Sequence, residues 1–228
     1  MGTVLAMTYF MNCAFIGGLM FFVAACGTAT DQPVLRVIGT AVGQIGQPAE
    51  DPLAGLTPDV VAQVSQPFIT VTLPATGARA TMGVFAETDG RREWRAGDAG
   101  SVVMIDDIVI ATRGLGDDLF HAELDRVSAA IAAGSGTSTR RHVYLDGENR
   151  MQQLRFTCQI STGNREIVDL INRRVTATKI NEICVEDGQI DPRFGNTYWV
   201  TGSAPEIVQS QQWIGPQSGF IIIQHLVR

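Results

Sequence analysis

From residue 67 to the end of the chain, apolar side chains recur at about every second position in short runs. The runs are rich in β-branched and aromatic residues, and Gly, Asp, Asn and Pro separate them. They are residues 67–73, 80–88, 92–96, 101–106, 107–113, 141–146, 151–162, 166–171, 174–187, 196–202, 206–214 and 219–227. A two-residue period buries one face of a strand, and short connections favour antiparallel neighbours. The sequence therefore predicts a mainly β fold, an antiparallel meander sheet or flattened open barrel, with one or two short covering helices.

Two segments interrupt this period. Thr57 is a capping residue followed by proline at the first helical position, and predicts a short helix. Residues 117–133 place apolar side chains near helical spacing, begin with two aspartates and end at Gly134, so they predict a longer helix. Turns are predicted at Asp146-Gly147, Gly163-Asn164, Asp187-Gly188 and Pro216-Gln217.

The N-terminal apolar run ends in residues 23–26, Val-Ala-Ala-Cys, which is the pattern of a lipoprotein signal. Small residues precede the expected cut, and the thiol of Cys26 can carry a diacylglycerol group. Residues 13–25 have the length of a signal-peptide apolar core and are short for a bilayer span. We therefore expect residues 1–25 to be removed as a signal peptide and Cys26 to be lipidated.

The expected mature chain has a lipidated tether over residues 26–56 and a single mainly β domain over residues 57–228. Gly27 is not the aspartate that retains lipoproteins at the inner membrane, so the expected location is the outer membrane, facing the periplasm. An uncleaved N-terminal anchor is the alternative, because the first basic residue is Arg36 and the signal has no basic side chain.

The charge of the chain limits its partners. The formal net charge is −6 at pH 7, and no block of Lys and Arg is present. This composition argues against nucleic acid and against electrostatic binding to anionic lipid, so the acyl chains would supply the membrane affinity. The sequence has no P-loop or dinucleotide-binding pattern, and no cofactor is predicted.

The four cysteines divide by compartment. Cys13 would leave with the signal and Cys26 would take the lipid, which leaves Cys158 and Cys184 as one pair in an oxidising space. They predict a disulfide between neighbouring strands, with two buried free thiols as the alternative. Closing the loop between Cys158 and Cys184 would stabilise the fold by about 3–4 kcal/mol in the chain-entropy treatment.

Residues 113–117, Arg-Gly-Leu-Gly-Asp, lie between a predicted strand and the predicted helix. Backbone N–H groups at a helix N-terminus, together with Arg113, suit an anionic sugar or a phosphate. The possible binding residues are Arg113, Gly114, Gly116 and Asp117. The alternative is a turn that needs glycine dihedral angles, with Asp117 or Asp118 as the helix cap.

Aromatic and amide residues form a second candidate. Trp199 and Trp213 could stack on sugar rings, and Gln211 and Gln212 could bond to sugar hydroxyls. Large aromatics more often fill β cores, and this holds for Trp94 and Tyr198 as well. The polar residues beside Trp213 are unusual for a strand that is only core.

No catalytic constellation is recognisable in the sequence. Carboxylates for sugar hydrolysis are available in the doublets Asp106-Asp107 and Asp117-Asp118, but adjacent residues of a strand point to opposite faces. One carboxylate from each doublet could still converge. His121, His142 and His225 lack the spacing of metal ligands, and no serine lies in a nucleophile motif. We expect neither catalytic residues nor a metal site.

Several stretches resemble a known family: residues 108–119 (IVIATRGLGDDL), 196–200 (NTYWV), 207–216 (IVQSQQWIGP) and 219–226 (GFIIIQHL). Together with the lipoprotein signal, they resemble the YjbF/GfcB-type lipoproteins associated with group 4 capsule and exopolysaccharide export. The resemblance implies a mostly β outer-membrane lipoprotein on the periplasmic side. It would work in polysaccharide secretion beside an outer-membrane β-barrel and other periplasmic partners. No catalytic residues follow from it.

The expected function is therefore a non-catalytic scaffold or glycan-contacting accessory in capsule or exopolysaccharide export. A polysaccharide-modifying hydrolase or lyase of the same pathway is the main alternative. A β-barrel carrier of an apolar ligand is a further one, and it predicts a dry cavity inside the sheet.

Overall fold

The computed structural model describes residues 51–97, 100–148, 150–202 and 205–228. The predicted signal peptide, Cys26 and most of the tether lie outside this range. The helices are α2 (Pro58–Ala62) and α3 (Val127–Ala133). The strands are β1 (Phe68–Leu73), β2 (Ala78–Thr88), β3 (Arg91–Arg95), β4 (Ser101–Ile105), β5 (Ile108–Arg113), β6 (Leu119–Asp125), β7 (Ser135–Leu145), β8 (Met151–Asp169), β9 (Arg174–Glu186), β10 (Pro192–Thr201), β11 (Glu206–Gly215) and β12 (Gly219–Val227).

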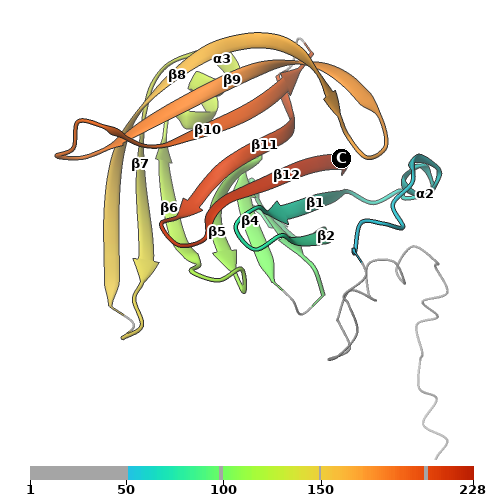
Figure 1. Cartoon of the computed structure of the whole chain (residues 1–228), viewed down its shortest axis with the longest axis horizontal. Helices are drawn as coiled ribbons and strands as arrows, with labels where there is room; N and C mark the ends of the chain where they lie inside the picture. Colours follow the sequence, from blue (N-terminus) through green and yellow to red (C-terminus); the bar gives the residue numbers. More distant parts are fainter. Residues whose placement is uncertain (1–50, 98–99, 149, 203–204) are drawn as a thin grey trace, which may run out of the picture. The chain divides into compact units, whose positions relative to one another are not determined.

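The twelve strands form one antiparallel sheet that curves into a nearly closed barrel (Figure 1). Its order is β5-β4-β3-β2-β1-β12-β11-β10-β9-β8-β7-β6, so the first strand pairs with the last. The sheet ends at β5 and β6, which are consecutive in the described chain but share no backbone ladder. We call this boundary the seam. The prediction of a mainly β meander or open barrel is confirmed.

Because the strands alternate in direction, their connections fall into two rims. The loop rim holds the β1–β2, β3–β4, β5–β6, β7–β8, β9–β10 and β11–β12 connections. The helix rim holds the β2–β3, β4–β5, β8–β9 and β10–β11 connections, together with α3 and the C-terminus. Neither helix in the described residues has the length and apolar character that crossing a bilayer requires.

Apolar side chains fill the interior. One cluster includes Trp94, Phe156, Phe194 and Trp213, and a second places the apolar face of α3 against strands at the helix rim. A third cluster joins α2 to the end of the β8–β9 hairpin. Within the described residues, the side chains of the first two clusters occupy the space where an apolar-ligand carrier would need a cavity.

The short helix is where the sequence predicts it. Thr57 caps α2, and its hydroxyl accepts a hydrogen bond from the Val60 N–H at 3.3 Å. The turns predicted at residues 146–147, 187–188 and 216–217 also lie between strands.

The predicted helix over residues 117–133 is wrong in its first half. Leu119–Asp125 is strand β6, paired with β7, and α3 begins only after Arg126, which has a left-handed backbone (φ 60°). Pairing with β7 gives the backbone N–H and C=O groups of β6 hydrogen-bond partners, and Leu119 and Ala122 become buried. These tertiary interactions outweigh the weak helical preference of the segment.

The turn predicted at Gly163-Asn164 is also wrong. Strand β8 continues from Met151 to Asp169, through most of the run predicted as a separate strand at residues 166–171. A register shift between Thr162 and Arg165 absorbs the irregular residues as a bulge.

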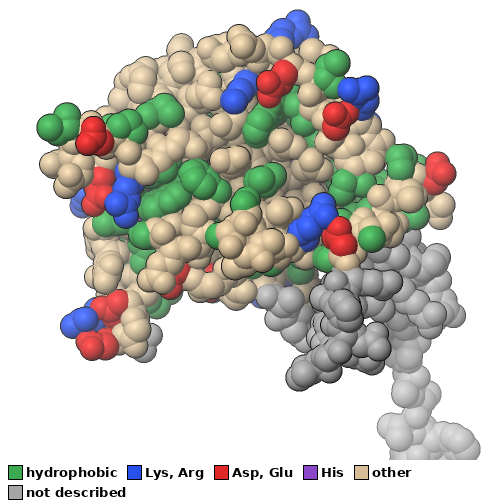
Figure 2. All heavy atoms as spheres, viewed as in Figure 1, with side chains coloured by type: hydrophobic (Ala, Val, Ile, Leu, Met, Phe, Trp, Pro, Cys, Tyr) green, Lys and Arg blue, Asp and Glu red, His purple; other side chains and the backbone are tan. Residues whose placement is uncertain are grey.

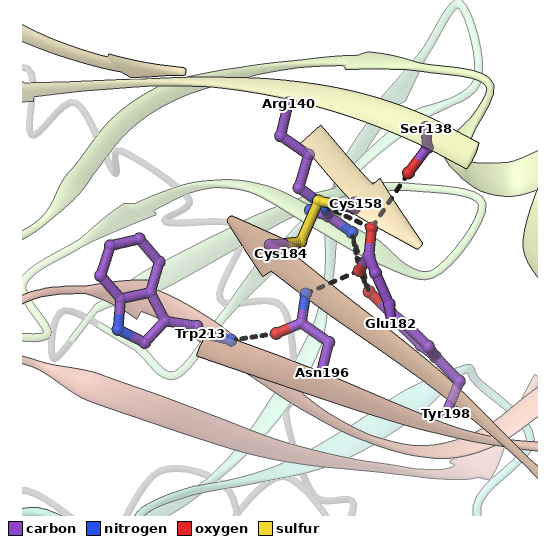
Figure 3. The surroundings of a disulfide bond; sticks show 8 residues. All are labelled: Ser138, Arg140, Cys158, Glu182, Cys184, Asn196, Tyr198 and Trp213. Carbon is purple, nitrogen blue, oxygen red and sulfur yellow. Dashed lines mark hydrogen bonds and ion pairs between the residues drawn. A yellow bond between two sulfur atoms is a disulfide. The ribbon is translucent and has the colours of Figure 1, made fainter. Parts of the chain in front are cut away.

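The predicted disulfide is confirmed. Cys158 and Cys184 face each other on β8 and β9 and are fully buried (Figure 3). Glu182, on the same face of β9, forms a bidentate ion pair with Arg140 of β7. Arg140 Nε donates to Oε1 at 2.9 Å and Nη2 donates to Oε2 at 2.8 Å. Both side chains are at most 2% exposed, so the pair lies entirely away from solvent.

Two further side chains complete this buried network. The Asn196 amide donates to Glu182 Oε2 at 2.8 Å, and the Tyr198 hydroxyl lies within 3.0 Å of Glu182 and 2.8 Å of Arg140. Burial opposes ionisation of both charged groups, but their mutual attraction and these hydrogen bonds lower the pKa of Glu182 and raise that of Arg140. Asn196 Oδ1 also accepts from the Trp213 N–H at 2.7 Å, so the network spans β7 to β11.

Removing one partner of the buried pair should be costly. Glu182→Leu leaves the Arg140 guanidinium buried and uncompensated, and we expect a loss of about 3–5 kcal/mol in the free energy of unfolding. Arg140→Met/Glu182→Leu removes both charges and should lose less than the single variant. Urea unfolding measures both.

The matched control is Arg174→Met, which breaks an ion pair with Asp169 whose side chains are 71% and 69% exposed. We expect a change below about 1 kcal/mol there. An equally small effect of Glu182→Leu would contradict the role assigned to the buried pair.

Candidate functional site

The β5–β6 loop (residues 114–118) closes the seam at the loop rim through the Asp118 carboxylate. Its Oδ2 accepts from the Gly114 N–H at 2.7 Å, and its Oδ1 accepts from the Leu115 N–H at 3.1 Å. The Thr112 hydroxyl donates to Oδ1 at 3.0 Å and accepts from the Leu119 N–H at 3.0 Å. One carboxylate and one hydroxyl therefore accept three backbone N–H groups, two in the loop and one at the start of β6.

Arg113 extends this closure onto β6. Its guanidinium donates to the carbonyl oxygens of Leu119 at 3.2 Å and Phe120 at 3.1 Å, and lies 5.1 Å from the Phe120 ring centroid. These bonds join β5 to β6 where no backbone ladder does. The Arg113 guanidinium, which the sequence predicts as a possible ligand for an anion, is therefore hydrogen-bonded to β6.

The sequence interpretation of this loop needs one correction. Gly114 and Gly116 adopt positive φ angles of 73° and 113°, as a turn requiring glycine would. No helix begins at Asp117 or Asp118, because β6 follows, so an anion site at a helix N-terminus and a helix cap are both wrong. Asp117 is exposed, and its carbonyl accepts from the Ser218 hydroxyl at 2.9 Å.

The structure separates the amide and tryptophan residues that the sequence groups together. Trp213 is buried and stacks on Phe194, with ring centroids 4.5 Å apart. Gln212 is also buried: its Oε1 accepts from the Val109 N–H at 2.9 Å and its Nε2 donates to the Asp107 carbonyl at 3.0 Å. Gln212 therefore links β11 to the seam-side strand β5, which explains a polar residue beside a core tryptophan.

Gln211 and Trp199 remain on the outer face of β11 and β10, half-buried. The Trp199 indole N–H donates to Glu166, and the ring centroid lies 5.8 Å from the Lys179 ammonium. Figure 2 shows that the centre of this face is largely uncharged. Trp94 and Tyr198 are fully buried, as expected for core aromatics.

The two aspartate doublets lie at opposite rims. Asp106 and Asp107 form the β4–β5 turn on the helix rim, and Asp107 pairs with Arg228 at 2.9 Å. Asp117 and Asp118 lie in the loop rim, beyond the six residues of β5. A strand of that length spans roughly 20 Å, more than the about 5–10 Å that separates the carboxylates of glycosidases. The geometry disfavours the convergence of one aspartate from each doublet.

The three histidines occupy different environments. His142 and His225 are buried, and burial is the main cause that lowers their pKa values to about 3 and about 4. His121 is half-buried beside the seam, where burial and the charges of Arg91, Arg141 and Arg113 lower its pKa. Among the described residues, Cys158, Glu182 and Cys184 are the one group with metal-ligating atoms close together, and the disulfide occupies both sulfurs.

Comparison with known proteins finds a family and a solved structure that are similar to this chain. A family model described as "Group 4 capsule polysaccharide lipoprotein gfcB, YjbF" matches residues 40–226. The chain belongs to this family. The match spans the whole sheet, including the β5–β6 loop and strands β10 to β12. Cys26 precedes it, so the family match does not itself cover the predicted lipidation site.

A solved structure has the same fold. The crystal structure of the hypothetical lipoprotein YmcC from Escherichia coli K12 superposes with a TM-score of 0.67 at 16% identity, covering 77% of this chain and 90% of that one. The search of curated proteins finds no match. Family membership implies a membrane-anchored envelope lipoprotein associated with capsule polysaccharide.

The two adjacent aspartates of the loop give a matched test of the seam. Asp118→Ala leaves the Gly114 and Leu115 N–H groups without their acceptor, and we expect a loss of about 1–3 kcal/mol in unfolding free energy. Asp117→Ala removes an exposed carboxylate and should change it by less than about 0.5 kcal/mol. Equal effects in thermal or urea unfolding would contradict the closure described here.

The buried histidines predict acid sensitivity. Between about pH 6.5 and their lowered pKa values, His142 and His225 take up protons in the unfolded chain but not in the folded one. Stability should therefore fall as pH decreases through this window, by about 1.4 kcal/mol per pH unit for each histidine. His225→Gln should flatten the slope of unfolding free energy against pH, and His121→Gln, partly solvated, should flatten it less. An unchanged slope in His225→Gln would refute this assignment.

Proposed function

We propose that this protein is a lipid-anchored accessory of capsule or exopolysaccharide export that acts without catalysis, as a scaffold or glycan-contacting component. The observation that carries the proposal is the family match over residues 40–226. The protein would be held at the outer membrane, facing the periplasm, beside an outer-membrane β-barrel and other periplasmic proteins of the export system.

The N-terminal sequence and the disulfide support this location. Residues 23–26 have the pattern of a lipoprotein cleavage site, and Gly27 does not favour retention at the inner membrane. The buried Cys158–Cys184 bridge suits an oxidising compartment such as the periplasm.

Several ionisable groups form structural ion pairs and hydrogen bonds, which supports a non-catalytic role. Glu182 and Arg140 neutralise each other inside the barrel, and Asp118 and Arg113 hold the seam. A site for acid–base chemistry instead needs titratable groups free to meet a substrate in a cleft. A packed barrel whose buried charges are held in structural bonds suits a rigid body that presents a surface to partners.

Deletion of the gene, complemented by wild type or by Cys26→Ser, tests the proposal. We expect the deletion to lower exported polysaccharide severalfold, measured as surface and periplasmic polymer in each strain. Cys26→Ser removes the thiol that carries the lipid, and should accumulate as folded protein without restoring export.

Two other results would contradict the proposal in different ways. If export is unchanged but the linkage or length of the polymer changes, a polysaccharide-modifying hydrolase or lyase replaces the scaffold. If full export returns with folded Cys26→Ser, anchoring has no role in the function.

A further inference from the structure

A recess lies beside the seam, toward the helix rim. It has a volume of about 480 Å³, within the range of small-ligand sites, and its walls come from β3, the β4–β5 turn, β5, β6 and α3. Its apolar lining includes Ile105, Ile110, Leu124 and Val127. We call it the seam recess. It exists because β5 and β6 are joined by side chains at the loop rim and by no backbone ladder in the described chain.

Arginines surround the seam recess. Arg91 and Arg126 line it, are exposed, and form no ion pair with any acidic side chain in the described residues. Arg141 lies beside it and pairs with the lining residue Glu123, Nε to Oε2 at 2.8 Å. Among the described residues, two arginines without an acidic partner therefore line the recess against one acid without a basic partner, Asp106, because Glu123 pairs with Arg141. This local excess of positive charge stands in a chain whose net charge is −6.

The charge of neighbouring arginines acts on one side chain of the recess, His121. His121 lines the recess, and Arg91, Arg141 and Arg113 each add to the effect of burial in lowering its pKa. Three cations from β3, β5 and β7 thus act on one side chain of β6 that lines the recess. A local positive potential on an otherwise acidic protein selects anionic ligands.

The shape of the recess identifies the kind of anion. A flat lipid surface would contact cations that protrude from the protein. Here the apolar side chains lie inside the recess, so a ligand has to enter the recess to contact them. A sugar ring with a carboxylate offers both an apolar C–H face and an anion for guanidinium groups.

We propose that the seam recess binds a carboxylate-bearing sugar unit of an acidic glycan, with Arg91 and Arg126 pairing with the carboxylate and the partly exposed Ile105 and Leu124 contacting the ring. This inference rests on the proposed function, because it names the class of polysaccharide that the accessory would contact.

Calorimetric titration of the full chain with oligogalacturonate, and with neutral dextran oligomers as the comparison, tests the site. We expect oligogalacturonate to bind and dextran not to bind. Arg91→Gln/Arg126→Gln should weaken oligogalacturonate binding at least tenfold. Raising salt from about 50 to about 200 mM should weaken wild-type binding, because the arginines are exposed and screened.

The matched control is Arg174→Gln/Arg193→Gln, which removes two exposed charges from β9 and β10, away from the seam. It should bind as wild type does. Thermal unfolding of both double variants checks that they fold, since surface substitutions of this kind change stability little.

Equal binding by Arg91→Gln/Arg126→Gln and wild type, or equal binding of dextran, would overturn the site. No binding of oligogalacturonate by folded wild type would overturn it as well. Capture of wild type by vesicles of anionic phospholipid, lost in the Arg91 and Arg126 variant and without oligogalacturonate binding, would assign the arginines to a membrane.

The export assay separates this inference from the function on which it rests. If deletion lowers export but the seam variant binds glycan normally, the seam recess is wrong and the accessory role stands. If deletion leaves the polymer unchanged, the accessory role fails whatever the titration gives.

Discussion

The pairing of β1 with β12 is the constraint on which the rest of this structure depends. It joins the two ends of the sheet-forming chain, so that eleven strand pairs form a continuous curved sheet with one remaining boundary. That boundary falls between β5 and β6, inside the chain and not at its ends. An unpaired strand edge carries free backbone groups and promotes association with other chains, so the fold has to satisfy them by other means.

Side chains from three places do this. Asp118 and Thr112 hold the loop, Arg113 bonds the carbonyl groups of β6, and Gln212 reaches across the interior to β5. These side-chain bonds do not form a backbone ladder between β5 and β6, and α3 packs at the helix rim. The side-chain bonds stabilise the loop rim. The missing backbone ladder between β5 and β6 leaves room for the seam recess.

The polar interior has a different consequence. The Arg140–Glu182 pair is hydrogen-bonded on nearly every side, and the network that it forms includes four strands, so it favours one register among β7, β9, β10 and β11. A pair of this kind contributes little net stability compared with apolar side chains of similar size. The buried disulfide beside it ties β8 to β9 covalently, and the buried neutral histidines make stability fall as pH decreases from about 6.5 toward their lowered pKa values.

Local sequence determined the fold class, the capped helix α2 and the disulfide. Each depends on a pattern or a pairing that the residues themselves carry: alternation, Thr57 before proline, and two cysteines left in an oxidising space. Tertiary structure decided the rest. Residues 119–125 have helical spacing, but their partner strand β7 makes them β6. Gln212 is next to Trp213 in sequence, yet its role depends on β5, about a hundred residues earlier. Arg91 and Arg126 line one recess only because the sheet closes on itself, and such long-range proximity leaves no local pattern in the sequence.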